Sequence, residues 1–511
     1  MRYRGHRLLL ITAIGLITSA HVGSPDTYFE GAAGPYPVRV VVRSPGVVPG
    51  LAQITVRLLA PRPVHRVLVV PVYWDPKTAA PPPADVAEPV PGDSTLYSAA
   101  LWLMREGAYS VRVTVEGPDG PGTTLVPVMA VATQRLELRT PLGILLFCLG
   151  SLLFAGAVTL IGAAARESAL EPGTAPDRRD RRRARIAAAG GTVLLALALV
   201  GGWGWWNAVD AAYRSGLFRP LHATATFRTA GRDRVLWLSI DDPTWVDPRR
   251  QRAPLIPDHG HLMHLFLVRD SGLAAFAHLH PVPRGAARFE TTPPPLPAGH
   301  YRVYADIVNE SGFTQTLVST ADLTTPATAW NPSDSDDSWV LDRGKGQEGK
   351  GKGGTSVSLG DASTMTWQRG AGPIVVTQDA RLVFAVSAPD GTPATLEPYM
   401  GMAGHLVLTR DDGAVFVHLH PAGTISLAAQ ETFELRQPGD TVPGALATRL
   451  TERDKHGNEP HRAGASPDGV VSFPYAFPRA GNYRLWVQVK RQGRILTGVF
   501  DIAVEGAASS R

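Results

Sequence analysis

Short stretches of alternating apolar and polar residues run through most of the chain. Examples are 38–42 (VRVVV), 54–59 (ITVRLL), 235–240 (VLWLSI) and 382–387 (LVFAVS), each bounded by turn-forming residues. A period of two is typical of strands with one buried face. The 44 prolines and 52 glycines add many turns and therefore favour short strands over long helices. The pattern predicts a mainly β protein.

A Gly-x-Tyr element recurs three times at the start of such a strand. The copies begin at Gly107, Gly299 and Gly481, and each follows a turn near the end of its segment. A tyrosine at this place pins a corner in immunoglobulin-like sandwiches. With 511 residues the chain is also too long for a single core. We therefore expect three immunoglobulin-like β-sandwich domains, over residues 21–138, 207–325 and 357–506.

Two apolar runs, 141–165 and 186–206, interrupt the β pattern. Each has the length of about 20 residues that a transmembrane helix needs. Between them, residues 166–185 carry seven arginines against four acidic residues. Short arginine-rich loops stay in the cytoplasm, so both flanks would face outward. The pattern predicts a transmembrane helical hairpin in a bacterial cell membrane, multi-pass, with the large domains on the extracytoplasmic side. Two buried helices of a soluble protein are the alternative.

Two further segments have a distinctive composition. Residues 1–20 combine Arg2, Arg4 and Arg7 with a short apolar run and a small-residue end, which is typical of a cleaved signal peptide. An uncleaved signal anchor is the alternative. Residues 326–356 are polar and rich in Gly, Ser, Asp and Lys, which predicts a flexible linker.

Charge and cysteine content exclude several classes of protein. The net charge of +5 is small for this length and much of it lies in the arginine-rich segment, so the composition does not indicate nucleic-acid binding. Cys148 is the single cysteine and lies inside an apolar run. Internal disulfides are therefore excluded, and so is a blue-copper site, which needs a cysteine thiolate.

Eight of the fifteen histidines lie in two matching windows, 258–281 and 399–421. Aligning Arg269-Asp270 with Arg410-Asp411 places His264 on His405. The same alignment places His259 and His261 on Met400 and Met402.

The turn of each window predicts which histidines face each other. In the second window a two-residue turn at Asp412-Gly413, a strong hairpin signal, pairs His405 with His420. A turn over 271–273 gives the equivalent pairing in the first window, and both registers place a further histidine two residues along on the same face. The registers pair Phe266 with His278 and Val407 with His418. The expected result is one patch of three histidines in each domain: His264, His278 and His280, and His405, His418 and His420.

Three imidazoles on one face can hold a metal ion. His259, His261, Met400 and Met402 would be auxiliary ligands. Imidazole suits zinc, copper or nickel, and thioether sulfur favours Cu(I), so the His-for-Met exchange between the windows favours copper, with zinc as the alternative. Structural histidines, each bonded to the backbone or to a neighbour, are the other interpretation.

The predicted sandwiches, with their His and Met positions and Gly-x-Tyr strands, resemble bacterial YtkA-like and CopC-like copper-handling proteins. The resemblance covers the outer domains only. It implies an immunoglobulin-like fold and copper binding or delivery in the periplasm.

The sequence therefore predicts a membrane-anchored protein that sequesters, senses or delivers copper, with a copper donor or acceptor protein as partner. An envelope interaction protein that binds no metal is the alternative. We expect no enzymatic activity, because Gly-x-Ser-x-Gly, His-Glu-x-x-His and paired catalytic carboxylates are absent. A metallo-enzyme would need a general base near the hairpins, and none is evident.

Overall fold

A computed structural model gives the fold of two units, a β unit (21–22, 26–45, 49–130 and 220–507) and a helical unit (46–48 and 131–219). The predicted signal peptide, residues 1–20, lies outside the described residues. The described residues are 21–22, 26–75, 77, 80–168, 170–171, 173–230, 233–246, 254–327, 330–342, 354–370, 372–437, 440, 442–455 and 466–507.

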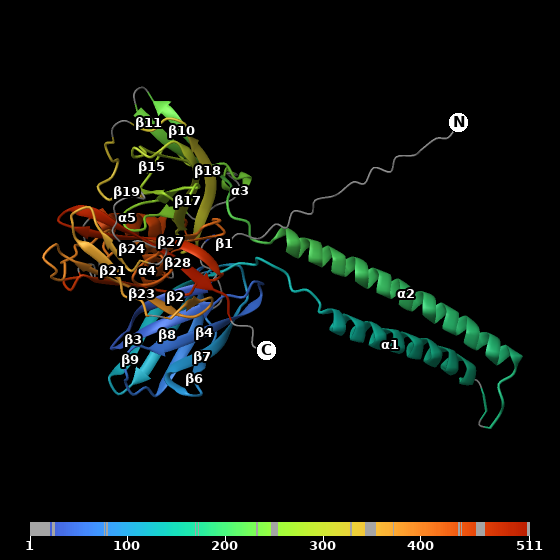
Figure 1. Cartoon of the computed structure of the whole chain (residues 1–511). Helices are drawn as coiled ribbons and strands as arrows, with labels where there is room; N and C mark the ends of the chain where they lie inside the picture. The colour runs from blue at the N-terminus through green and yellow to red at the C-terminus, as the bar shows by residue number, and fades with distance from the viewer. Residues whose placement is uncertain are drawn as a thin grey trace, which may run out of the picture. The chain divides into compact units, whose positions relative to one another are not determined.

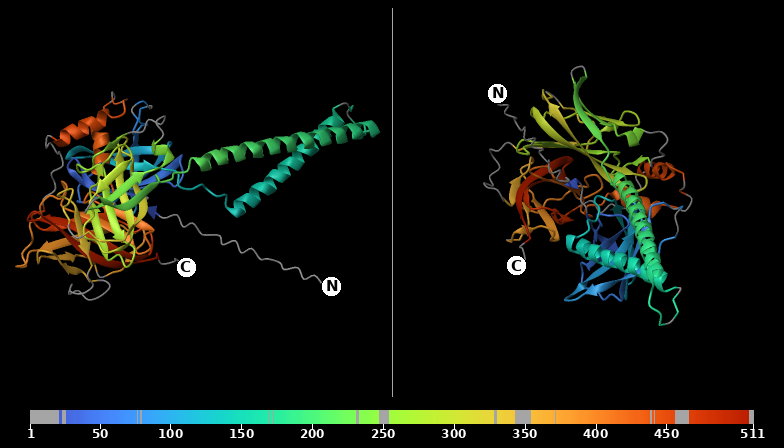
Figure 2. Two further views of the ribbon diagram at one scale, coloured as in Figure 1. Left: turned by 90° about the horizontal axis from the view of Figure 1, so that it is seen from above. Right: turned by 90° about the vertical axis from the view of Figure 1, so that its right-hand side faces the viewer.

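The helical unit is a hairpin of two long helices, α1 (Thr140–Glu167) and α2 (Arg178–Ser215) (Figure 1, Figure 2). Both are long and apolar enough to cross a membrane, and neither has a buried residue. Phe147 is 75% exposed and Trp203 is 68% exposed. Because large apolar side chains cover both helices, the hairpin indicates association with a membrane.

The arginine-rich segment 166–185 was expected to be a loop, but part of it is helical, because α2 begins at Arg178. The carboxylate of Asp177 accepts hydrogen bonds from the backbone N–H groups of Arg179 and Asp180, and the carboxylate of Asp180 accepts one from the N–H of Asp177. This capping box satisfies N–H groups that a helix start leaves unpaired. The helix can therefore start in a polar segment, ahead of the apolar run.

The first domain is an eight-stranded sheet that folds over its own core. The strands at the two ends of the path, β2 and β9, contact each other, and Val40, Val56 and Val113 are fully buried. In the order β2-β3-β4-β7-β6-β5-β8-β9 the strands are Asp26–Ala33, Tyr36–Arg43, Gly50–Leu58, Asp93–Leu103, Asp85–Val90, Arg66–Tyr73, Gly107–Gly117 and Gly120–Ala130.

The second domain is a sandwich of two sheets. The first sheet has the order β10-β11-β16-β15: Ala223–Ala230, Asp233–Ile240, Arg288–Thr291 and Val282–Pro283. The second has the order β12-β17-β13-β14-β19: Leu255–Ile256, Gly299–Asn309, His264–Arg269, Ala275–Leu279 and Ser338–Leu341; β18 (Thr314–Leu323) also pairs with β17. A short helix, α3 (Pro243–Val246), follows β11.

The third domain repeats this plan. One sheet has the order β20-β21-β23-β26: Ser356–Ser358, Thr364–Trp367, Ala380–Ser387 and Val470–Tyr475. The other has the order β1-β25-β24-β27-β28-β22: His21–Val22, Val415–Leu419, His405–Arg410, Gly481–Arg491, Arg494–Glu505 and Ile374–Val375. Helices α4 (Leu427–Leu435) and α5 (Ala445–Lys455) form an insertion after β25. The chain is thus mainly β, with immunoglobulin-like sandwiches and one helical hairpin.

The Gly-x-Tyr tyrosines pin corners in the second and third domains. The hydroxyl of Tyr301 donates to the carbonyl of Pro297 at 2.7 Å, and the hydroxyl of Tyr483 donates to the carbonyl of Arg479 at 2.7 Å. In both cases the acceptor is four residues upstream, as in the tyrosine corner of immunoglobulin-like sandwiches. The prediction for these two tyrosines is confirmed.

The segment 326–356, expected to be a flexible linker, contains strand β19 (Ser338–Leu341). Strand β19 pairs with β14, with Ser338 opposite His278 and Trp339 opposite Ala277. The described residues 330–342 thus extend the second-domain sheet that carries the histidine hairpin. The sequence pattern did not predict this strand, because it is only four residues long and the residues on both sides of it are polar and acidic.

The second and third domains pack face to face through equivalent strands. Phe276 stacks on Trp486, with ring centroids 4.7 Å apart and planes at 11°, and Tyr304 stacks on Phe416 at 3.8 Å and 9°. All four side chains belong to one buried cluster. Phe276 matches Phe416 in the sequence repeat, and Tyr304 matches Trp486. The two stacked pairs therefore join the same two repeat positions with the domains exchanged. This is the approximate two-fold symmetry expected where two copies of one surface pack together.

Candidate metal centre

Both histidine hairpins have the registers that their turns predict. Phe266 pairs with His278 between β13 and β14, and Val407 pairs with His418 between β24 and β25. His264 and His405 begin the first strand of each hairpin. His280 and His420 directly follow the second strands.

The contact between the domains brings the histidines of both hairpins together at one end of the interface. The ring centroids of His259 and His405 are 5.3 Å apart, those of His259 and His420 are 5.0 Å apart, and those of His264 and His418 are 5.6 Å apart. We call these eight residues the histidine cluster: His259, His261, His264, His278, His280, His405, His418 and His420.

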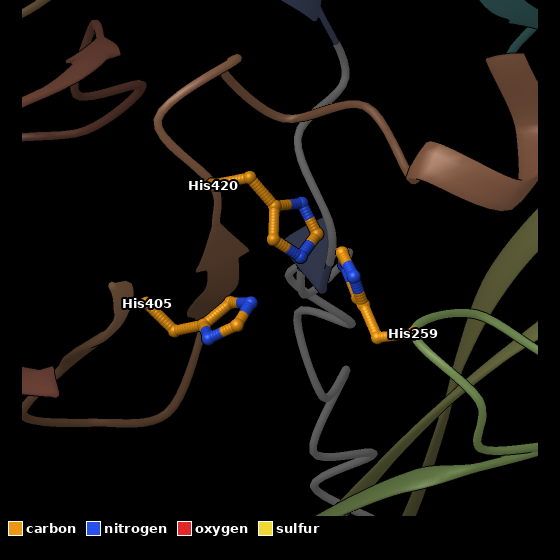
Figure 3. Close-up of side chains that lie close together, drawn as sticks. All are labelled: His259, His405 and His420. Atoms are coloured by element: carbon orange, nitrogen blue, oxygen red, sulfur yellow. The ribbon is translucent and has the colours of Figure 1, made fainter. Parts of the chain in front are cut away.

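Two groups of three histidines within the cluster have nitrogens close enough to share an ion. His259, His405 and His420 form the interdomain triad, whose rings come together from both domains (Figure 3). His264, His278 and His280 form the second-domain triad, the group expected from the first hairpin. In each triad the ligand nitrogens lie within 4.8 Å of one another. Bonds of about 2.0–2.1 Å require a movement of about 1 Å or less per ring to close around a metal ion.

A third group lies at the solvent side of the cluster. It contains His261, His280 and Asp334. The rings of His261 and His280 stack at 3.9 Å, and the side chain of His261 is 17% exposed. His280 is shared with the second-domain triad, so the two groups lie next to each other.

The patch expected from the second hairpin, His405 with His418 and His420, is not among these groups. The segment before β13 of the second domain places His259 against His405 and His420, in the role expected for His418. The Nδ1 atom of His418 instead lies 3.3 Å from the carboxylate of Asp306 in the second domain. Docking of the two domains, which the sequence pattern did not predict, causes this exchange.

Met400 and Met402 occupy the positions that His259 and His261 have in the second domain. Met400 is 8% exposed and has a φ of 49°, close to the φ of 53° at His259. The backbone of Met400 hydrogen-bonds the ring of His259. The segment with Met400 thus contributes a backbone contact to the interdomain triad.

Burial keeps the histidine cluster neutral. Loss of solvent lowers the pKa of all eight histidines, that of His420 to about 4, and neighbouring imidazoles lower most of them further. Neutral imidazole is the form that binds a metal ion.

Six buried ring nitrogens of the cluster have no hydrogen-bond partner. They are Nε2 of His259, His280, His418 and His420, and both nitrogens of His405. More than about 90% of buried polar groups in proteins have a partner, and leaving one without costs about 1–3 kcal/mol. A concentration of lone-pair nitrogens on touching rings matches the chemistry of a metal site.

The opposite nitrogen of two of these rings is held by an oxygen. Nδ1 of His280 lies 3.1 Å from the carboxylate of Asp337, and Nδ1 of His420 lies 2.8 Å from the carbonyl of Ile425. These acceptors place the ring proton on Nδ1 and leave the lone pair of Nε2 facing the cluster. Metal-binding histidines are commonly oriented by such a bond.

Three polar residues of the site were missed by the sequence reasoning. Asp337 lies in the segment interpreted as a linker, and Asp306 and Gln488 lie on β17 and β27. A signal was present for the last two. Each lies seven residues after the glycine of its Gly-x-Tyr element, on the same strand face as Tyr304 or Trp486. A polar residue on a face of large aromatic side chains indicates a buried polar partner.

We expect Asp337→Ala to weaken binding of an ion at the second-domain triad by about 10–100-fold, because the Nδ1 atom of His280 loses its acceptor. Competition titration with a chromogenic chelator measures the change. Asp336→Ala is the matched control, since the Asp336 carboxylate pairs with Lys490 at 3.3 Å. Equal affinities for both variants would contradict a role for Asp337 in orienting His280.

Comparisons with known proteins identify a family for one domain only. Residues 357–506 match the model of the family "Domain of unknown function (DUF8832)", which is less than a third of the chain. No curated protein matches the sequence.

Similar solved structures include a tetra-tandem repeat of the extending region of a large adhesion protein, with 9% identity, 94% of this chain and 74% of that chain covered, and a TM-score of 0.16. The FN1–FN3 domains of chicken CNTN1 share 8% identity, with 91% and 97% covered and a TM-score of 0.13. A putative membrane anchored protein from Corynebacterium diphtheriae shares 9% identity, with 94% and 96% covered and a TM-score of 0.13. Similarity at this level gives no information about function.

Proposed function

We propose that this protein binds a transition-metal ion, copper or zinc, in the interdomain triad of its histidine cluster. The unpartnered nitrogens carry this proposal: of six buried ring nitrogens without a hydrogen-bond partner, four belong to His259, His405 and His420. None of the four has a hydrogen-bond partner among the described protein groups, and one metal ion would accept a lone pair from each of the three rings.

Copper is the first candidate and zinc the second. Neutral imidazole is a ligand for both ions, and copper(II) binds nitrogen sites more tightly than zinc. The interdomain triad offers nitrogen from three rings, and the carboxylate of Asp258 lies 3.8 Å from Nε2 of His259. The harder ions magnesium and calcium prefer oxygen ligands and are disfavoured here.

The proposed role is sequestration or sensing at the outer face of a membrane. The side chain of His259 is 1% exposed and His405 is fully buried, so an ion at this depth would exchange slowly with solvent. The arginines at the start of α2 favour a cytoplasmic position for the α1–α2 connection, which would put the β domains outside. His261 and Asp334, at the solvent side, are suited to pass an ion toward His280.

Metal retention by the full-length protein in detergent tests the proposal. We expect the wild-type protein to retain copper or zinc after dialysis against a weak chelator, and His405→Ala to lose the ion of the interdomain triad. His300→Ala is the matched control, because His300 is a half-exposed histidine that pairs with Asp322 at 2.8 Å outside the cluster. If the wild-type protein retains no ion, the proposal is wrong and the sandwiches are better interpreted as interaction domains.

A further inference from the structure

The hydrogen-bond partners of the second-domain triad set which of its ring nitrogens carry protons. Nε2 of His264 lies 3.0 Å from the backbone carbonyl of Asp258, and a carbonyl can only accept. The proton of neutral His264 is therefore on Nε2. Its Nδ1 carries a lone pair, and this atom lies 3.2 Å from Nε2 of His278.

The ring of His278 has its proton on the side away from His264. Nδ1 of His278 lies 3.0 Å from Oε1 of Gln488, which is an acceptor. The same Nδ1 lies 3.5 Å from the hydroxyl of Tyr399, whose own proton goes to the carbonyl of Asp336 at 3.0 Å. The amide nitrogen of Gln488 donates to Oγ of Ser338, so its oxygen faces His278. With that orientation both neighbours of Nδ1 accept, Nδ1 is the protonated atom and Nε2 carries a lone pair.

Two lone pairs thus face each other at 3.2 Å, inside a fully buried site. A cation between them removes the repulsion. With metal–nitrogen bonds of about 2.05 Å, a nitrogen separation of 3.2 Å corresponds to an N–metal–N angle of about 100°, close to tetrahedral.

His280 supplies a third nitrogen to the same position. Its Nδ1 is held by Asp337, and its Nε2 is buried without a partner. The ligand nitrogens of His264, His278 and His280 lie within 4.8 Å of one another. Each of the three rings therefore has one nitrogen bonded to an oxygen and the other free to bind an ion, as in zinc and copper sites built from histidine.

We infer that the histidine cluster is a two-metal centre, with a second zinc or copper ion bound by Nδ1 of His264 and the Nε2 atoms of His278 and His280. This inference rests on the proposed function of the interdomain triad. The two ions lie side by side, since the rings of His259 and His264 are 5.9 Å apart. His418 lies between the triads, with its ring 5.3 Å from that of His405 and 5.6 Å from that of His278.

Gln488 makes the second ion depend on the contact between the domains. It lies on β27 of the third domain, whereas all three ligands of the second ion belong to the second domain. Gln488 is a positioning residue, because it fixes the proton of His278 and touches no ion. The second site therefore has the hydrogen bond that orients His278 only when the second and third domains are in contact.

Ion stoichiometry of the full-length protein in detergent tests the inference, with Zn(II) or Cu(II) as the probe and native mass spectrometry as the readout. We expect two ions in the wild-type protein, one in His278→Ala and one in His259→Ala. One ion in the wild-type protein that His259→Ala loses and His278→Ala keeps would overturn the second site and leave the proposed function intact. Loss of both ions in a folded His278→Ala variant would also overturn it. No ion in the wild-type protein would overturn both.

A second pair of variants tests the same site without removing a ligand. Gln488→Leu removes the acceptor of His278, so the second ion should bind about 10–100-fold more weakly, with the first ion unchanged. Gln488→Glu retains an acceptor oxygen and should restore the affinity of the second ion. Equal affinities of the second ion for wild-type protein, Gln488→Leu and Gln488→Glu would contradict the assigned protonation of His278.

Discussion

Replacing His259 with alanine is expected to abolish the stabilisation that the first ion gives to the third domain, although His259 belongs to the second. An ion at about 1,000 times its Kd stabilises the state that binds it by about 4 kcal/mol. For domains of this size that amount corresponds to a rise in Tm of about 10 °C. The rise depends on rings from both domains, because His259 lies beside His405 and His420 (Figure 3).

The cross-domain origin of this effect is measured with a double-mutant cycle. His259→Ala and His405→Ala should each remove the Tm rise caused by the first ion, and the double variant should lose no more than either single variant. Residues that act through one shared ion are strongly non-additive. Differential scanning calorimetry with and without metal gives the values, with His300→Ala as the unaffected control. Independent, additive losses would show that the two histidines do not share an ion.

Acidification is expected to destabilise the metal-free protein from about pH 6.5 downward. Each cluster histidine has a pKa lowered by burial in the folded state, so the unfolded chain binds more protons below pH 6.5. Stability therefore falls as the pH decreases through the window between the unfolded value and the folded value. For His420, whose pKa falls from 6.5 to about 4, the loss below pH 4 is about 3 kcal/mol.

The carboxyl groups of Asp306 and Asp337 act in the opposite direction. Burial raises the pKa of Asp306 to about 6 and that of Asp337 to about 7, so these groups bind protons more readily in the folded state. They stabilise the folded protein as the pH falls toward their unfolded values near 3.8. The eight histidines outnumber these two carboxyl groups, so net destabilisation is expected.

Urea unfolding followed by tryptophan fluorescence between pH 7.5 and pH 4 measures this dependence. His405→Phe should reduce the slope of stability against pH by about one proton, because it removes one buried histidine whose ring nitrogens have no partners. Bound metal should shift the whole transition to lower pH, since protons compete with the ion for the same nitrogens. A stability that stays constant from pH 7 to pH 5 would contradict neutral burial of the cluster.

Local patterns were sufficient to predict the hairpins. The period of two and the turns at 271–273 and 412–413 determine which residues face each other, and Phe266 opposite His278 follows from counting alone. The two helices also follow from length and apolar composition. These features depend on residues near each other in the chain, where the hydrophobic period and the turn length determine the structure.

Docking of the second and third domains could not be predicted in the same way, because it depends on the fit between two surfaces far apart in sequence. His259 and Gln488 acquire their roles only from that fit. One signal was present and overlooked. Residues 265–268 (LFLV) and 406–408 (LVL) are apolar on both strand faces, and both faces are buried. A strand that is apolar on both faces needs another layer of the protein packed against each face.

X-ray absorption at the copper or zinc edge of the loaded full-length protein tests the central claim most directly. The histidine cluster predicts a first shell of about three or four nitrogen atoms at about 2.0 Å, with the outer-shell scattering of imidazole rings. His259→Ala should lose the first ion and therefore lower the edge intensity per protein, whereas His300→Ala should leave the spectrum unchanged. A first shell of oxygen atoms alone, without imidazole scattering, would contradict binding in the cluster.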